Sequence, residues 1–361
     1  MELTTAARGY TYVTLAAALF AVNGSVSKVV LETGLEPTWL AALRCTGAAA
    51  GLGLILLAAS PSRLRTGVRE LPALVLLGFA GAAMVQWLYF VAIDRIPIGI
   101  ALLLEFTAPV FVALYVRFVR RQEVRPLTWL AIGLALAGLA LVAQVWTDAG
   151  LDPIGVAAGI GAAVCVATYF LVGSHAVAAR DTSSLTFYMF MFGAVFWAVV
   201  QPWWTFDPST ITGSTSLLGS LEGFSVPVWF AVGWIVVLGT LGPYSLNLAA
   251  LRHVSPTAVG VVGMSEPLGA GLVAWAWLGQ VMRPVQIAGG LVVLVGIVLV
   301  QRSTAPVTAT NAAEPQPVPA RPVTEVSGPS GALPQAHNVA FGVGEIGREP
   351  HVGHRGSADH R

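Results

Sequence analysis

Charged side chains are scarce in this chain. They make up 10% of its 361 residues, and Lys28 is the single lysine. A soluble domain carries about 25% charged residues, so this composition excludes an ordinary soluble globule. Cysteine is scarce as well, because only Cys45 and Cys165 are present, both inside apolar segments, which gives no disulfide framework. The Gly-x-Ser-x-Gly, His-Glu-x-x-His and phosphate-loop motifs are also missing, so the sequence predicts no enzyme activity, no metal site and no cofactor.

Long apolar runs are what the chain has in abundance. Hydrophobic residues make up 56% of it, and the mean hydropathy is +0.75. A bilayer core about 30 Å thick needs roughly 20 apolar residues per helical span. Ten stretches come close to this length, at Tyr10–Leu31, Pro37–Ala59, Leu71–Ile93, Ile98–Val119, Leu127–Val145, Ile154–Gly173, Leu185–Trp204, Pro227–Leu251, Thr257–Leu278 and Pro284–Gln301. The sequence therefore predicts an all-α membrane protein with about ten transmembrane helices.

The apolar part of the chain is repeated. A shift of 158 positions places Gly78–Val142 on Val236–Val300 without a gap, and it places Pro109 on Pro267. Each half then holds five predicted spans, and because five is odd the second half enters the membrane from the opposite side. Two inverted five-helix repeats are the plan of many secondary transporters, in which the substrate site lies at the repeat interface.

Arginines predict how the chain is oriented. Seven of them fall in or beside the second and fourth loops, namely Arg63, Arg65, Arg69, Arg117, Arg120, Arg121 and Arg125. The first, fifth and seventh loops contain none. Because positive residues gather on the cytoplasmic side of a membrane, we expect both termini to be cytoplasmic in a bacterial-type inner or plasma membrane.

We predict three parts along the chain: a first five-helix repeat at 10–145, a second at 154–301, and a disordered cytoplasmic tail at 302–361. The tail is rich in Pro, Ala, Gly, Ser and polar residues, a composition that cannot bury a core. Its last histidines, at His351, His354 and His360, have a spacing that supports a metal site only weakly. A solvated tail is the preferred interpretation.

Two carboxylates lie deep inside predicted helices. A charge at the centre of a bilayer costs from about 2.5 kcal/mol upward, yet Glu105 and Glu266 both lie near the midplane, where transporter sites usually fall. The repeat aligns Glu105 with Gly263, so the two acids are offset by three residues and stay near one helix face. We expect both to line a central cavity, with Glu105 binding a substrate amine or carrying a coupling proton. The alternative is a structural role, as partners of a buried arginine or of backbone groups freed by the prolines that follow.

Two cations and several polar side chains complete the predicted cavity. Lys28 and Arg44 lie in the outer thirds of the first two helices. They either join the acids or hold a substrate carboxylate, or they extend their head groups to the outer interface. The polar residues that we assign to the cavity are Asn23, Gln86, Tyr89, Tyr244 and Asn247. Each of these alone is equally suited to hydrogen bonding between helices.

Three prolines lie inside predicted spans: Pro109, Pro243 and Pro267. Each removes a backbone hydrogen bond and tends to kink its helix, and in lipid the freed carbonyl must find another partner. We expect these positions to serve either as gates or as purely structural kinks.

The segment Ile96–Val110, which reads Ile-Pro-Ile-Gly-Ile-Ala-Leu-Leu-Leu-Glu-Phe-Thr-Ala-Pro-Val, resembles the fourth helix of drug/metabolite transporters with paired EamA domains. Within that superfamily it is most similar to threonine/homoserine-type amino-acid exporters. The segment Gly263–Gly269, Gly-Met-Ser-Glu-Pro-Leu-Gly, resembles the matching ninth helix. The resemblance implies an inverted-repeat fold of ten helices around a central cavity, and export of small metabolites. The chain departs from the common pattern in one loop, where the first half has Glu123 and the second has Val281.

We therefore expect a secondary active transporter that exports amino acids or related small metabolites by alternating access, as a proton antiporter. Its partners are then the substrate, the coupling proton and the lipid bilayer, while a homodimer is left open and no nucleic-acid partner is expected. Two alternatives remain: a carrier for another small solute or drug, and a non-transporting membrane sensor or scaffold that acts through its tail.

Overall fold

The computed structural model describes residues 5–145, 152–279, 281 and 283–304, and these contain ten helical segments long and apolar enough to cross a membrane. The ten are Thr5–Leu31, Pro37–Ala59, Leu71–Ile93, Gly99–Val119, Pro126–Ala143, Pro153–Ala179, Thr182–Val200, Val228–Ala250, Pro256–Leu278 and Pro284–Ser303. They confirm the predicted all-α membrane fold. The sixth helix is longer than predicted, because it continues to Ala179. The last helix includes residues 302–304, which we had assigned to the tail, and the rest of the predicted tail lies outside the described residues.

Six of the ten spans are single helices. They are α1 (Thr5–Leu31), α2 (Pro37–Ala59), α7 (Pro126–Ala143), α8 (Pro153–Ala179), α9 (Thr182–Val200) and α15 (Pro284–Thr304). Asp152 and Asp181 cap the starts of α8 and α9, accepting backbone hydrogen bonds at Ile154, Gly155 and Ser184. The remaining four spans are interrupted, and apart from a last π-helical turn in the fourth span the interruptions occur at equivalent positions of the two repeats.

The third and eighth spans each contain a wider, π-helical turn. In the third, α3 (Leu71–Gly78) leads through the turn η2 (Phe79–Met84) into α4 (Val85–Ile93). In the eighth, α11 (Val228–Val236) leads through η6 (Val237–Leu241) into α12 (Gly242–Ala250). The 158-residue shift places Phe79 on Val237, so both turns begin at the same repeat position. Such turns are frequent at functional sites.

The fourth and ninth spans are broken into two helices each. The fourth consists of α5 (Ile98–Glu105), α6 (Ala108–Leu114) and a final turn η3 (Tyr115–Val119). The ninth consists of α13 (Pro256–Gly263) and α14 (Glu266–Leu278). The same shift superposes the two breaks, at residues 106–107 and 264–265. The repeat therefore extends from the sequence to the irregularities of the backbone.

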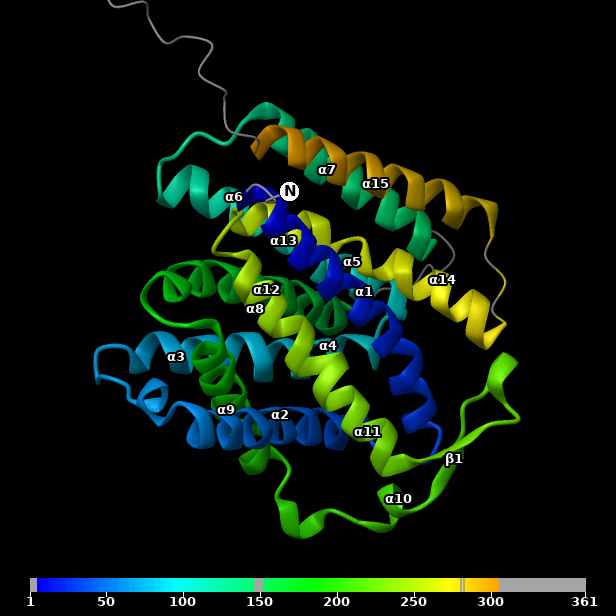
Figure 1. Ribbon diagram of the computed structural model, residues 1–361. Coiled ribbons are helices and arrows are strands. Elements are labelled where there is room, and N and C mark those ends of the chain that lie inside the picture. The colour runs from blue at the N-terminus through cyan, green and yellow to red at the C-terminus, as the bar shows by residue number, and fades with distance from the viewer. Residues whose placement is uncertain (1–4, 146–151, 280, 282, 305–361) are drawn as a thin grey trace, which may run out of the picture. The chain divides into compact units, whose positions relative to one another are not determined.

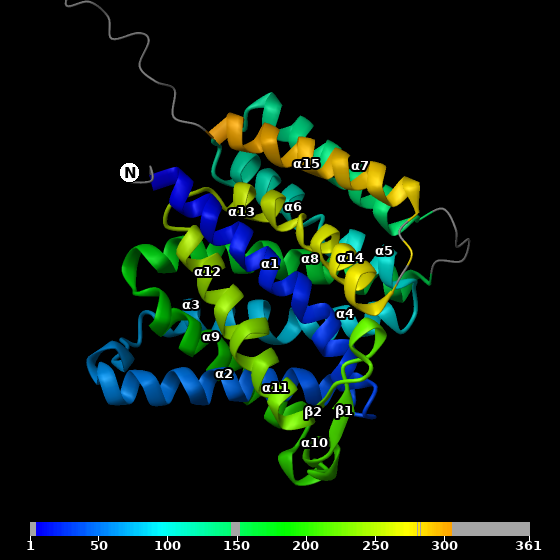
Figure 2. The ribbon, with the colours of Figure 1, turned by 45° about the vertical axis from the view of Figure 1, so that its right-hand side comes forward.

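The last helices of the two repeats, α7 and α15, pack side by side (Figures 1 and 2). A Cβ added to Gly138 would lie 2.7 Å from the backbone nitrogen of Val293, and one added to Gly296 would lie 3.0 Å from that of Ala135. The shift of 158 exchanges these two contacts. Glycine at both positions lets the helices approach closely, and the reciprocal contact relates the repeats by a pseudo-twofold axis at this seam.

A small polar structure connects α9 to α11. It contains η4 (Trp203–Thr205), α10 (Ser209–Thr212), β1 (Ser214–Ser216), η5 (Gly219–Leu221) and β2 (Ser225–Pro227). The strands form an antiparallel hairpin in which Thr215 pairs with Val226 (Figure 2). The hairpin is held to the end of α14, because the Trp277 indole donates to the Leu217 carbonyl at 2.9 Å and the Ser220 hydroxyl donates to the Trp277 carbonyl at 3.0 Å.

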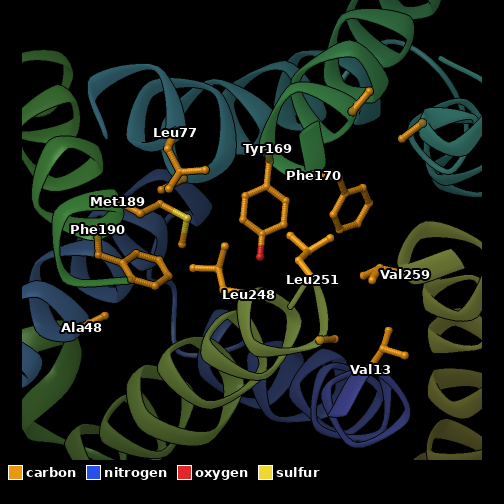
Figure 3. Packing of buried hydrophobic residues seen from close by; sticks show 14 of the residues in the cluster. Val13, Ala48, Leu77, Tyr169, Phe170, Met189, Phe190, Leu248, Leu251 and Val259 are labelled. Atoms are coloured by element: carbon orange, nitrogen blue, oxygen red, sulfur yellow. The ribbon is translucent and has the colours of Figure 1, made fainter. Parts of the chain in front are cut away.

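The opposite end of the molecule is organised by Arg180, which follows α8. Its guanidinium donates to Ser184, Thr66 and Glu70 and to the carbonyls of Arg63 and Arg65. These bonds tie the loop between α2 and α3, which includes η1 (Pro61–Leu64), to the junction of α8 and α9. Between the two ends lies an apolar core, to which Leu77, Tyr169, Met189, Phe190 and Leu248 belong (Figure 3).

Candidate functional site

A cavity of about 280 Å³ lies among helices of both repeats. Eight of the nine side chains that we assigned to the site from the sequence line it, namely Asn23, Arg44, Gln86, Tyr89, Glu105, Tyr244, Asn247 and Glu266. They come from α1, α2, α4, α5, α12 and α14. Pro109 also lines this cavity, whereas Pro243 and Pro267 are absent from its wall. The structure thus brings together residues that are up to 243 positions apart in the chain.

The polar lining obeys the repeat. Gln86 on α4 and Tyr244 on α12 are 158 positions apart, and so are Tyr89 and Asn247. Both pairs face the same cavity just beyond the π-helical turns. The wider turn re-aims the residues that follow it, so the two turns direct equivalent positions of the two repeats toward one space.

The two carboxyl groups lie at the helix breaks. Glu105 is the last residue of α5, and Glu266 is the first residue of α14. At each break a hydroxyl residue bends back to the carbonyl three residues earlier: Thr107 donates to Leu104 at 2.6 Å, and Ser265 donates to Val262 at 2.8 Å. Competition of this kind between a hydroxyl and the helical ladder interrupts helices.

The prolines reinforce these breaks. Pro109 and Pro267 have no N–H, so neither can donate to the carbonyl four residues earlier, at Glu105 and Gly263 respectively. Glu105 and Gly263 are equivalent in the repeat, and both line the cavity. Irregular backbone at membrane depth is tolerated where it lines a cavity, and this arrangement places both acids at such a point.

Arg44 contacts backbone and hydroxyl groups at this site. Its Nε donates to the Thr240 hydroxyl at 2.8 Å, and one terminal nitrogen donates to the Gly239 carbonyl at 3.3 Å. Among the described residues no ion pair within 4.0 Å joins Arg44 to Glu105 or Glu266. The guanidinium is anchored by neutral acceptors on η6 and lies at the cavity wall.

Four buried polar atoms of the cavity lack a hydrogen-bond partner within the described part of the chain. They are Asn23 Oδ1, Gln86 Oε1, the Tyr169 hydroxyl and Asn247 Oδ1. An unsatisfied buried polar group costs about 1–3 kcal/mol, so a group of four around one cavity favours a polar ligand there. Gln86 uses only its amide nitrogen, which donates to the Ala82 carbonyl at 2.8 Å.

Tyr169 on α8 is a lining residue that sequence reasoning missed. Its side chain is 4% exposed, and its ring packs against Gly81, where an added Cβ would lie 2.8 Å from the ring carbon Cδ2. It also meets the Tyr244 ring edge-on, with centroids 5.9 Å apart. The only sequence signal for it is a phenol inside an apolar helix, and this signal does not distinguish a cavity from a core.

Lys28 is the assigned residue that does not reach the cavity. Its side chain is exposed and lies one turn before the end of α1. This position fits the alternative interpretation, in which the lysine extends its head group to the membrane interface. Within the described residues, no cluster of three or more His, Cys, Asp or Glu side chains could hold a metal ion.

Comparison with known proteins gives the family. The model of the EamA-like transporter family matches residues 7–144 and 153–302. The threonine/homoserine exporter RhtA of Salmonella typhimurium is 29% identical over 273 residues, which cover 74% of this chain and 84% of that protein. RhtA of Escherichia coli K12 is 30% identical over 240 residues, covering 65% and 74% respectively. An uncharacterized transporter of Bacillus subtilis, YdfC, is 25% identical over 270 residues, covering 74% and 83%.

A solved crystal structure supports the fold in the same way. It covers 80% of this chain and 96% of its own, with a TM-score of 0.61 at 18% identity. Two matched family segments, ten apolar helices and the repeated backbone irregularities together describe an integral multi-pass membrane transporter for small molecules. The chain belongs to the EamA-like transporter family.

Proposed function

We propose that this protein exports small amino acids or closely related metabolites by alternating access, coupled to protons. The observation that carries the proposal is the lining of the central cavity. Glu105, Glu266 and Arg44 line it together with amide and phenol side chains. An amino acid carries an ammonium group and a carboxylate, and these charges are complementary to such a lining. The relatives named threonine/homoserine exporters support the same substrate class.

The size of the cavity supports a small substrate. Pockets for drug-sized ligands measure about 300–1,000 Å³, and this cavity has about 280 Å³. Its aromatic side chains, among them Phe20, Phe106 and Phe170, suit the apolar part of a metabolite. A polyphosphorylated substrate is disfavoured, because Arg44 is the only cation in the lining that the structure describes.

We assign separate roles to the charged groups. Arg44 binds the substrate carboxylate, and one of the two glutamates binds the substrate amine. The same carboxyl group carries the coupling proton once the substrate has left, so substrate and proton occupy the site in turn. The bends at Pro109, Pro243 and Pro267 are the hinges at which the cavity opens to either side. Consistent with the arginine distribution, we place both termini in the cytoplasm and the protein in the inner or plasma membrane.

Counterflow in proteoliposomes tests the proposal. The purified chain is reconstituted, and exchange of radiolabelled threonine and homoserine is measured with and without a pH gradient. We expect saturable exchange that responds to the gradient and that Glu105→Gln removes or uncouples. Glu123→Gln is the matched control, because Glu123 is an exposed loop residue of the same repeat. Absence of exchange for every amino acid offered overturns the substrate class, and a gradient response that survives in Glu105→Gln overturns the role of that residue.

A further inference from the structure

A second cavity, of about 540 Å³, lies at the arginine-rich end of the molecule. It is formed where α3 begins, where η3 follows α6 and where α8 ends. These ends of the helices lie on the left side of Figure 1. It shares no lining residue with the central cavity. It is therefore a separate site, and nothing in the proposed transport cycle uses it.

The charges around this second cavity do not balance. Arg69, Arg120 and Arg180 line it, and Glu70 is the single acid of its described lining. Glu70 is paired with Arg180, whose side chain is only 10% exposed. Neither Arg69 nor Arg120 belongs to any ion pair among the described residues, and both side chains are exposed. Two guanidinium groups without carboxylate partners thus face one cavity.

The rest of the lining suits an anion attached to an apolar body. Tyr115 supplies a hydroxyl group, and His175 is oriented because its Nδ1–H donates to the Leu171 carbonyl at 2.7 Å. The floor is apolar, with Leu74 and Leu185 each 1% exposed. The cavity thus combines cationic and apolar side chains at the ends of membrane-spanning helices. Lipid headgroups lie at such helix ends.

We propose that this second cavity binds a phosphate group, with Arg69 and Arg120 as its principal contacts. The planar fork of arginine binds phosphate oxygens in pairs, which gives the site geometry as well as charge. Basic pockets between transmembrane helices on the cytoplasmic side suit the headgroups of anionic phospholipids. A free phosphate ion has the same chemistry, and the two sources are separated by experiment.

Thermal unfolding of the purified full chain in detergent provides the test. Tm is measured with phosphatidylglycerol, with phosphatidylcholine, and with sodium phosphate against sodium chloride at matched ionic strength. We expect phosphatidylglycerol to raise Tm and phosphatidylcholine to leave it unchanged. The double variant Arg69→Gln/Arg120→Gln should weaken the apparent affinity at least tenfold. The control Arg65→Gln/Arg117→Gln removes the same charge from the same end of the molecule without touching the cavity, and it should retain the response.

The outcomes separate the two sources of phosphate. A response to phosphatidylglycerol alone assigns the site to a lipid headgroup, and an equal response to sodium phosphate assigns it to a soluble anion. The proposal is overturned if neither probe raises Tm, or if the control variant loses the response as fully as the cavity variant does. If the glutamine variant fails to fold, the variant Arg69→Lys/Arg120→Lys takes its place. It keeps both positive charges but lacks the planar guanidinium groups. An undiminished response in the lysine variant overturns the role of the two arginines.

Discussion

Arg44 donates a hydrogen bond to the carbonyl of Gly239, and Pro243, four residues later, has no N–H to offer that carbonyl. A proline has no N–H for the residue four positions earlier. In a membrane the freed carbonyl needs another partner, and a cation from the opposite repeat supplies one. The same guanidinium lines the central cavity, so the backbone at Gly239 and the positive charge of the site depend on one side chain.

This relationship predicts energetic coupling between Arg44 and Pro243. Arg44→Gln should cost about 1.5–3 kcal/mol, the usual contribution of hydrogen bonds to a charged group. In a Pro243→Ala background the alanine N–H can serve Gly239, so the same substitution should cost less. A double-mutant cycle from denaturant unfolding measures the coupling, which we expect to be about 0.5–3 kcal/mol. Strictly additive effects would show that Arg44 does not substitute for the missing donor.

Gly239 should tolerate no side chain. A Cβ at this position would lie 2.6 Å from Asn23 Cγ and still closer to Asn23 Oδ1. We expect Gly239→Ala to displace Asn23, to destabilise the protein by about 1–3 kcal/mol and to impair transport. Gly233→Ala is the matched control on α11, because nothing lies within 4 Å of its added Cβ. Thermal unfolding of the two variants decides the prediction, and equal Tm values contradict it.

The hydroxyl of Tyr169 should serve a ligand rather than the fold. It is buried without a partner in the described chain, so Tyr169→Phe should leave Tm unchanged or raise it. If the hydroxyl bonds to substrate, the apparent affinity for substrate should fall about 2- to 10-fold, the equivalent of one net hydrogen bond. Tyr188→Phe should behave in the opposite way, because its hydroxyl donates to the Leu64 carbonyl at the arginine-rich end. There we expect a lower Tm with an unchanged affinity.

Arg180 should be the arginine whose loss most damages stability at that end. It donates to three side chains and two carbonyls, whereas Arg63 makes a single 3.9 Å ion pair with Asp181 and is 53% exposed. Arg180→Gln should cost at least about 1.5–3 kcal/mol. Arg63→Gln should cost about 0–1 kcal/mol, as exposed pairs do. Denaturant midpoints for the two variants give the comparison, and similar midpoints would contradict it.

Much of the fold could be predicted because its irregularities follow the sequence repeat. The 158-residue shift matches the helix breaks beside Glu105 and Glu266 and pairs the cavity positions of Gln86 and Tyr244. Depth along a helix was enough to select most of the polar residues that line the cavity, because polar side chains at the midplane are rarely exposed to lipid. The direction in which a side chain points could not be predicted in the same way. The assignment of Lys28 to the cavity was wrong for that reason.

Other features of the site have no signature in the sequence. Tyr169 lies on α8, beyond the gapless part of the repeat, and its role depends on the close approach of Gly81. A π-helical turn depends on the packing of the whole span, so no single residue predicts it. A proline shows that a carbonyl is freed, but only the tertiary structure shows that Arg44 reaches it.

The seam between α7 and α15 bears on the ancestry of such a chain. Its two glycine contacts exchange under the repeat, as contacts do across the interface of a symmetric dimer. A single five-helix protein would form the same contacts if its copies inserted into the membrane in both orientations. Two such copies would then pair along this seam. Fusion of two genes for such a protein would then remove the need for dual insertion, and the arginines of each half would become free to diverge. The seam is thus the surface on which two copies of such a five-helix unit would meet.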